Sequence, residues 1–142
     1  MLFTKPMKRN ADFQRLYRSG AFCSLGGALL YAKPNQLPCN RLGITAGKKV
    51  GNAVMRNRAK RIIRAAYTAA EPMLPVGMDI VIVARNTLPQ QNASILIERF
   101  CNRGVQHLQD VSSGKIPCQN PRQQKGNQKK DSPRKPQNPA GE

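Results

Sequence analysis

The side chains of this chain that could take part in chemistry are mostly cations, and acids are scarce. Lys and Arg number 24, Asp and Glu number 7, and one histidine is present, so the formal net charge at pH 7 is +17. A protein nuclease would need a general acid and base, or a cluster of carboxylates that holds a metal ion. The acids of the first 109 residues are Asp12, Glu71, Asp79 and Glu98, and no two are close in sequence. We therefore predict no catalytic residue and no metal-binding site.

The cysteines and the apolar runs also restrict the class of protein. Cys23, Cys39, Cys101 and Cys118 contain no CxxC pair, and His107 is the single histidine, so a zinc site is not expected. No apolar run approaches the roughly 20 residues that a membrane-spanning helix needs. The N-terminus has no apolar stretch typical of a signal peptide. We expect reduced thiols in a cytoplasmic protein without a membrane partner.

The most informative stretch is the basic run from Lys48 to Arg64, KKVGNAVMRNRAKRIIR, which contains no acid. On a helix, its apolar residues and the alanines that follow share one stripe: Met55, Ala59, Ile62, Ile63, Ala66 and Ala70. Its polar side chains fill the opposite arc, with Arg58 at the flank: Arg56, Asn57, Lys60, Arg61 and Arg64. Like charges four residues apart repel each other, and the first acid that follows is Glu71.

A polyanion would relieve this repulsion, so the basic arc predicts a phosphate-binding face. Asn52 is a plausible N-cap of the helix, and Gly51 allows a tight approach to it. Lys48 and Lys49 would then lie beside the helix N-terminus, whose free N–H groups favour anions. We accordingly predict that Lys48, Lys49 and Asn52 bind nucleic acid together with the arc. A solvated charged surface is the alternative, and it fits less well because such surfaces usually mix both signs.

The elements that would position these residues alternate along the chain. Helices are expected at Asn10–Arg18 (capped by Asn10), at Ala53–Ala70 and at Asn92–Gln109. Strands are expected at Ala28–Lys33, Arg41–Gly47 and Asp79–Arg85, with a shorter one at Ala21–Leu25 before Gly26-Gly27. This order predicts a small α+β sandwich with helices packed on a sheet.

The C-terminal part differs in composition from the rest. Residues 110–142 contain five of the eleven prolines and almost no large apolar side chain after Ile116. Such a segment cannot bury enough apolar surface to offset its ordering entropy. We predict one RNA-binding domain over residues 1–109 and a disordered basic Pro/Gln-rich tail over residues 110–142.

The basic run resembles the signature of the bacterial ribonuclease P protein family, whose hallmark Arg-Asn-Arg stands here at Arg56-Asn57-Arg58. Its context is similar to the family in order and spacing: DFQRLYRSG near the N-terminus, RLGITAGKK before the motif and DIVIVAR after it. The resemblance covers roughly residues 4–109. Ala65 departs from the pattern, because members often carry a polar or acidic residue there.

The resemblance implies a two-layer α+β sandwich like domain 2 of ribosomal protein S5. It would have a four-stranded mixed sheet, three helices and a left-handed βαβ crossover through the basic helix. It also implies a protein subunit of the endoribonuclease that removes the 5′ leader from precursor tRNA. In that family the catalytic RNA carries the Mg²⁺ ions and the chemistry, so no cofactor is expected on the protein. The implied partners are the catalytic RNA, bound by the arginine-rich motif with one protein per RNA, and precursor tRNA.

The resemblance further implies a cleft between the first helix and the sheet that takes the single-stranded leader. Phe13, Tyr17 and Tyr31 match its aromatic positions, and aromatic rings with basic groups are what single-stranded RNA binds. Arg9 and Arg85 are predicted phosphate contacts at its rim. The alternative is that Phe13 and Tyr17 are core residues that anchor a short helix.

Two other kinds of protein would carry the same basic helix. One is a ribosomal or architectural RNA-binding protein without a processing role. The other is a DNA-binding protein, for which the helix is poorly suited because Asn57 is the only side-chain amide on its cationic face. Only a ribonuclease P subunit would stimulate the cleavage of precursor tRNA.

Overall fold

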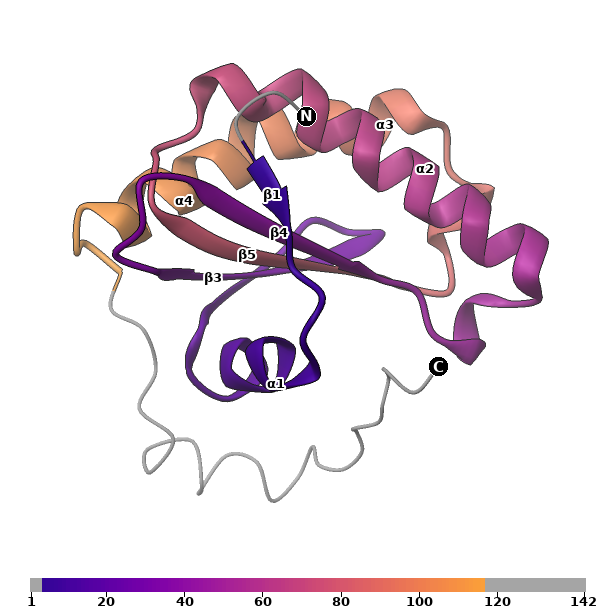
Figure 1. Ribbon diagram of the computed structural model, residues 1–142. Coiled ribbons are helices and arrows are strands. Elements are labelled where there is room, and N and C mark those ends of the chain that lie inside the picture. Colours follow the sequence, from indigo (N-terminus) through magenta and orange to yellow (C-terminus); the bar gives the residue numbers. More distant parts are fainter. Residues whose placement is uncertain (1–3, 117–142) are drawn as a thin grey trace.

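A mixed β-sheet with helices on both faces forms the protein, as the computed structural model shows for residues 4–116 (Figure 1). The strands are β1 (Thr4–Pro6), β2 (Ala21–Ser24), β3 (Ala28–Pro34), β4 (Asn40–Thr45) and β5 (Met78–Ala84). The helices are α1 (Asn10–Ser19), α2 (Ala53–Ala70), α3 (Ala93–Arg99) and α4 (Val105–Ser112). Short turns of helix stand at η1 (Lys48–Val50), η2 (Glu71–Met73), η3 (Leu88–Gln90) and the π-helical η4 (Phe100–Gly104). Helix α1 lies on one face of the sheet, and the other helices cover the opposite face (Figure 1).

The sheet has five strands in the order β1-β4-β5-β3-β2, so the expected number of four is wrong by one. The additional strand is β1, which pairs in parallel with β4. Its three residues, Thr-Lys-Pro, show neither apolar alternation nor β-branched enrichment beyond Thr4, and proline is tolerated in a strand at a sheet edge. Tertiary contacts hold it instead: the Thr4 hydroxyl lies 2.7 Å from the Tyr67 hydroxyl and donates to Glu71 Oε2 at 2.7 Å.

The mixed sheet and the crossover through α2 confirm the predicted α+β fold, although α1 adds a layer on the second face of the sheet to the two layers predicted (Figure 1). Strands β4 and β5 are parallel neighbours, and α2 makes the crossover between them, while β3 is antiparallel to both β5 and β2. Alternate side chains of the central strands, such as Leu30, Ile80 and Ile82, are buried in the main core, to which the helices also contribute. The other sheet face forms a smaller core with α1 around Leu16 and Val81.

The apolar stripe of α2 is buried as predicted from Ala59 to Ala70, with two differences. Met55 is only half-buried near the start of the helix, and Tyr67, which the sequence analysis did not include, is fully buried. Tyr67 packs with its ring centroid 6.0 Å from that of Phe100. Burial in the core raises the pKa of Tyr67 to about 12, so its hydroxyl stays neutral and bonded to Thr4.

The ends of the first and the last predicted helices differ from the prediction. Arg9, not Asn10, occupies the N-cap position of α1, and it makes no side-chain cap hydrogen bond. The single helix expected at residues 92–109 is interrupted by η4 and continues as α4 to Ser112, with Val111 buried. Ile116 also packs against the main core, so ordered residues reach past position 109. The predicted tail from residue 117 onward lies outside the described residues.

Candidate nucleic-acid interface

The start of α2 is built as the sequence predicts. The Asn52 side chain caps the helix by accepting a hydrogen bond from the Met55 backbone N–H at 3.0 Å. Gly51 has a φ of 138°, a conformation that favours glycine, and this lets the chain turn from η1 into the helix. Lys48 and Lys49 are exposed on η1, directly before the helix N-terminus. The free N–H groups and the two ammonium groups therefore make this end of α2 electropositive.

The cations of α2 lie on its outer face, where water or a polyanion can reach them. Arg58, Arg61, Arg64 and Asn57 are exposed, and Arg56 and Lys60 are half-buried. Among residues 4–116, ion pairs involve only Arg15 and Arg41, so none of the α2 cations has a counterion there. We call this surface, Lys48, Lys49, Asn52, Arg56, Asn57, Arg58, Lys60, Arg61 and Arg64, the basic face.

Arg58 differs from its neighbours because part of its side chain is already engaged. Its Nε donates to the Pro89 carbonyl oxygen at 2.8 Å, which ties α2 to η3 and orients the guanidinium. Arg58 and Arg61 line a shallow groove of about 250 Å³ between α2 and α3, together with Ile62, Ala65 and Ala93. Family members often carry a polar or acidic residue at the position of Ala65, and a carboxylate there could pair with an arginine. Ala65 has no carboxylate, so it provides no counterion for Arg58 or Arg61.

The predicted aromatic residues meet on the opposite face of the sheet. The ring centroids of Tyr17 and Tyr31 are 5.3 Å apart in an edge-to-face arrangement, and Phe13 packs over Gly43, where an added Cβ would lie 2.5 Å from its ring. Phe22 of β2, which was not among the predicted residues, has its ring centroid 5.4 Å from that of Tyr31. We call these four side chains, Phe13, Tyr17, Phe22 and Tyr31, the aromatic cluster.

The aromatic cluster is both core and surface. Phe13, Tyr17 and Tyr31 are half-buried against the small core of Met7, Leu16 and Val81, so the core interpretation holds in part for Phe13 and Tyr17. Burial raises the pKa of Tyr31, which keeps its hydroxyl neutral. A signal for Phe22 was available: a two-residue turn at Gly26-Gly27 pairs Phe22 with Tyr31, and this register is observed.

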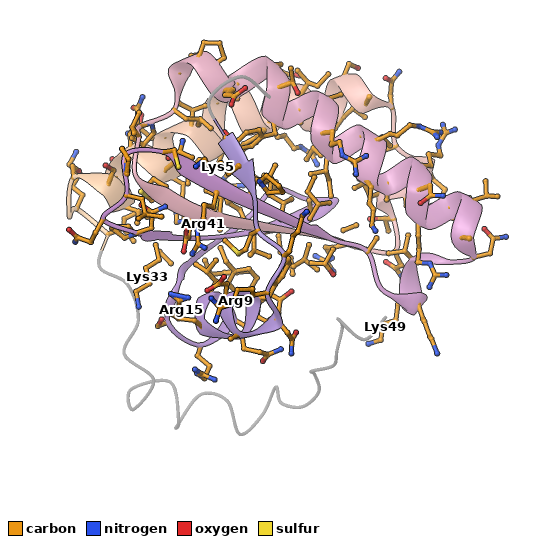
Figure 2. All side chains as sticks on the ribbon, in the orientation of Figure 1. Lys5, Arg9, Arg15, Lys33, Arg41 and Lys49 are labelled. Carbon is orange, nitrogen blue, oxygen red and sulfur yellow. The ribbon has the colours of Figure 1, made fainter. Side chains whose placement is uncertain are left out.

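The two predicted rim arginines lie at opposite ends of the sheet. Arg9 directly precedes α1 and lies near Asp12. Asp12 is linked through Arg41 to Asp79, so Arg9 lies near the start of β5. Arg85 follows β5, with its backbone N–H bonded to Gly27. At about 3.3 Å per residue, β5 separates the two by on the order of 20 Å. Figure 2 shows Arg9, Arg15 and Lys33 beside α1, well apart from Lys49.

The structure brings two of the few acids together around Arg41. Arg41 makes a bidentate contact with Asp79 (Nε–Oδ1 2.8 Å, Nη2–Oδ2 2.6 Å), and its Nη1 lies 3.3 Å from Asp12 Oδ2. Asp12 also accepts a hydrogen bond from Arg15. This bond and the charge of Arg41 lower the pKa of Asp12, although burial opposes them. The role of Arg41 has no local signal in the sequence, because its partners are 29 and 38 residues away.

The remaining groups that could do chemistry are placed as follows. His107 is buried in α4, and its Nε2 lies 3.2 Å from the Ala21 carbonyl oxygen, which is a structural contact. Within residues 4–116, no group of three or more His, Cys, Asp or Glu side chains could hold a metal ion. Asp12 and Asp79 are both ion-paired with Arg41, so their carboxylates do not fit a metal site. No helix in the described part is long and apolar enough to cross a membrane.

A basic helix that has no counterion within the described residues lies on one side of the sheet, and aromatic rings lie on the other. Together they define an RNA-binding protein of the α+β sandwich class. Comparison with known proteins narrows this class. The family model described as Ribonuclease P matches residues 3–108. The chain therefore belongs to the ribonuclease P protein family, the protein components of the endoribonuclease that matures the 5′ end of tRNA.

Individual relatives and solved structures agree with this. The chain is 39% identical over 79 residues to the ribonuclease P protein component of Natranaerobius thermophilus, covering 56% of this chain and 69% of that protein. It is 38% identical over 87 residues to that of Oceanobacillus iheyensis, covering 61% of this chain and 72% of that protein. The structure of the Staphylococcus aureus RNase P protein matches with a TM-score of 0.61 and 30% identity, covering 75% of this chain and 94% of that one. The Thermotoga maritima protein, at 24% identity and a TM-score of 0.62, supports the fold alone.

Proposed function

We propose that the basic face of α2 binds phosphates of the catalytic RNA of ribonuclease P. The observation that carries this proposal is that the α2 cations have no counterion in residues 4–116. Such a face is stabilised when RNA phosphates replace the missing carboxylates and condensed counterions are released. The capped N-terminus of α2, with Lys48 and Lys49 beside it, would take a phosphate as well.

The aromatic cluster, on the other side of the sheet, is proposed to bind the 5′ leader of precursor tRNA. Tyr17 and Tyr31 present ring edges and faces at a partly open surface, and each stacked base contributes about 1–3 kcal/mol. Arg9 and Arg85, at the two ends of the sheet, would contact leader phosphates on either side of the rings. This arrangement lets one protein hold the catalytic RNA with one face and the substrate with the other.

In this proposal the chemistry belongs to the RNA and its Mg²⁺ ions, and the protein supplies affinity. The acids of the described part support such a division, because Asp12 and Asp79 are neutralised by arginine, and Glu71 is buried and bonded to Thr4. We further propose that one protein assembles with one RNA in the cytoplasm. A ribosomal or architectural role would use the basic face alone and would leave the aromatic cluster without a ligand.

The test is reconstitution of the full chain with its ribonuclease P RNA at low Mg²⁺ concentration. We expect the protein alone to leave precursor tRNA intact and the complex to cleave it. Changing both Tyr17 and Tyr31 to Ala should weaken the binding of precursor tRNA by about 1–3 kcal/mol per lost stacking contact. The binding of mature tRNA, which lacks the leader, should barely change.

A denaturation curve and the affinity for the catalytic RNA serve as controls for that variant. If the two tyrosines were only core, their truncation would cost several kcal/mol of stability, and the binding of precursor and mature tRNA would fall together. Equal losses for the two substrates would therefore remove the leader-binding role. Cleavage by RNA-free protein that is lost on mutation of His107 or Glu98 would contradict the assignment of the chemistry to RNA.

A further inference from the structure

The aromatic cluster extends beyond the rings that the family resemblance identified, to the edge of the sheet. Phe22 lies on β2, the outermost strand on that side, directly opposite Tyr31 of β3. Its ring centroid is 5.4 Å from that of Tyr31, which in turn lies 5.3 Å from that of Tyr17. The three rings form a continuous row from α1 to the outermost strand of the sheet on that side.

Folding does not account for the position of the Phe22 ring. The side chain is 47% exposed and belongs to neither cluster of core residues. The other exposed large apolar side chains in residues 4–116 all lie in loops or helices: Leu37, Val54, Met73, Val76 and Ile95. An exposed apolar side chain on an edge strand invites unwanted pairing with other chains. A ring in that position, in contact with a second ring, is suited to stacking on a flat ligand.

Two arginine side chains reach the β2 edge, and cations of this kind can bind the phosphates of single-stranded RNA. Arg103 Nη1 lies 3.4 Å from the Ser24 carbonyl oxygen, and Arg99 Nη1 lies 3.3 Å from that of Leu25. Both guanidinium groups are therefore placed within two or three residues of Phe22 along the strand. Neither arginine has an ion-pair partner in the described part of the chain. Aromatic rings together with cations without carboxylate partners are the combination by which proteins hold single strands.

We propose that Phe22 is a further base-stacking residue, which binds one nucleotide of a longer leader beyond those at Tyr17 and Tyr31, with Arg103 near its phosphate. This inference rests on the proposed leader-binding function and deepens it. Phe22 then determines how strongly the protein favours precursors with long leaders over precursors with short ones.

The test uses the reconstituted complex and precursor tRNAs whose leaders increase one nucleotide at a time. Phe22→Leu keeps an apolar side chain but removes the ring, and Phe22→Tyr keeps the ring. We expect Phe22→Leu to weaken binding roughly tenfold once the leader is long enough to reach β2, and to leave shorter leaders unchanged. Phe22→Tyr should bind like the parent. Met73→Ala is the matched control, because Met73 is equally exposed at 47% but lies in η2, after α2, and it should affect no leader length.

A spectroscopic measurement locates the contact. With 2-aminopurine at each leader position in turn, Phe22→Leu should change the fluorescence at one position, and Tyr31→Ala should change it at another. Phe22→Leu would overturn the inference if it weakened every substrate equally, mature tRNA included, or if it had no effect while Tyr17 and Tyr31 substitutions did. If the tyrosine substitutions also showed no dependence on the leader, the proposed leader-binding function itself would fail.

Discussion

Arg41 ties α1 to the sheet by ion pairs, in addition to the apolar contacts of Leu16 and Val81. Its guanidinium joins Asp79 of β5 to Asp12 of α1, and it is itself a β4 residue. Both carboxylates are buried, so burying them without the cation would destabilise the folded state. The hydrogen bond to Asp79 raises the pKa of Arg41, so it remains charged. Because α1 carries Phe13 and Tyr17, this ionic contact sets where two rings of the aromatic cluster lie.

The same contact predicts how stability depends on pH. Arg15 and Arg41 hold the pKa of Asp12 below its ordinary value of 3.8, so the folded state binds this proton less readily than the unfolded state. The stability that Asp12 contributes is fully present above pH 3.8 and is lost as the pH falls through its lowered pKa. Arg41→Met should reduce the free energy of unfolding by roughly 3 kcal/mol at pH 7. The gap to the parent should narrow below pH 3.8, as urea denaturation at a series of pH values would show.

Asp12→Asn is the control for that experiment, since it removes the titrating group and keeps a side chain of similar shape. Its stability should vary less with acid pH than that of the parent. If the gap between the parent and Arg41→Met were the same at pH 3 and pH 7, Asp12 would not be the group responsible.

At the scale of elements, the break between α3 and α4 follows from one close contact. A Cβ added to Gly104 would lie 2.0 Å from Phe100 Cδ1, and the Phe100 ring is buried against Tyr67. Gly104 therefore makes room for a core ring within its own helix turn. The wide turn of η4, where π-helical bonding replaces the α-helical pattern, accommodates the two residues together.

Gly104→Ala tests this packing, because helix propensity and packing predict opposite signs. In an open helix the change would stabilise the protein by about 1 kcal/mol. Here the methyl group must displace Phe100, and overpacking a core costs about 1–3 kcal/mol. We expect a net loss of about 1–2 kcal/mol, measured by chemical denaturation. Gly47→Ala is the control, since its added Cβ meets no atom within 4 Å. A Gly104→Ala protein more stable than the parent would show that Phe100 can move at no cost.

The sequence predicts those elements whose apolar period and capping residues lie within the element itself. The bounds of α2 and its cap at Asn52 follow from the apolar period and a capping residue, and both are found as expected. Strand β1 and the network around Arg41 could not be predicted, because each depends on partners at least 29 residues away. Phe22 lies between these cases: the turn at Gly26-Gly27 fixes its register, but its exposure depends on how α1 covers the sheet. The family resemblance supplied the leader cleft, which composition alone would not have indicated.

At the scale of the whole molecule, charge is unbalanced. The net charge is +17, and only Arg15 and Arg41 of the described cations form ion pairs. Self-repulsion of this size destabilises a compact chain, and salt screens it. The free protein should therefore become more stable as NaCl is raised, while its complex with RNA should become weaker. The opposite responses have one cause, since the same cations repel each other in the free protein and bind phosphates in the complex.

The basic face can be tested through both responses with one variant, in which Arg56, Arg61 and Arg64 are changed to Ala. Arg58 is left in place because its bond to Pro89 also holds η3. Each phosphate contact that is lost should reduce the slope of log K for the catalytic RNA against log salt by roughly 0.7–0.9. The free variant should be at least as stable as the parent and should gain less from added NaCl, because the buried stripe of α2 is intact. Changing Lys125, Lys129 and Lys130 to Ala removes the same charge from another part of the sequence. If that control reduced the RNA slope equally, net charge rather than the basic face would determine assembly.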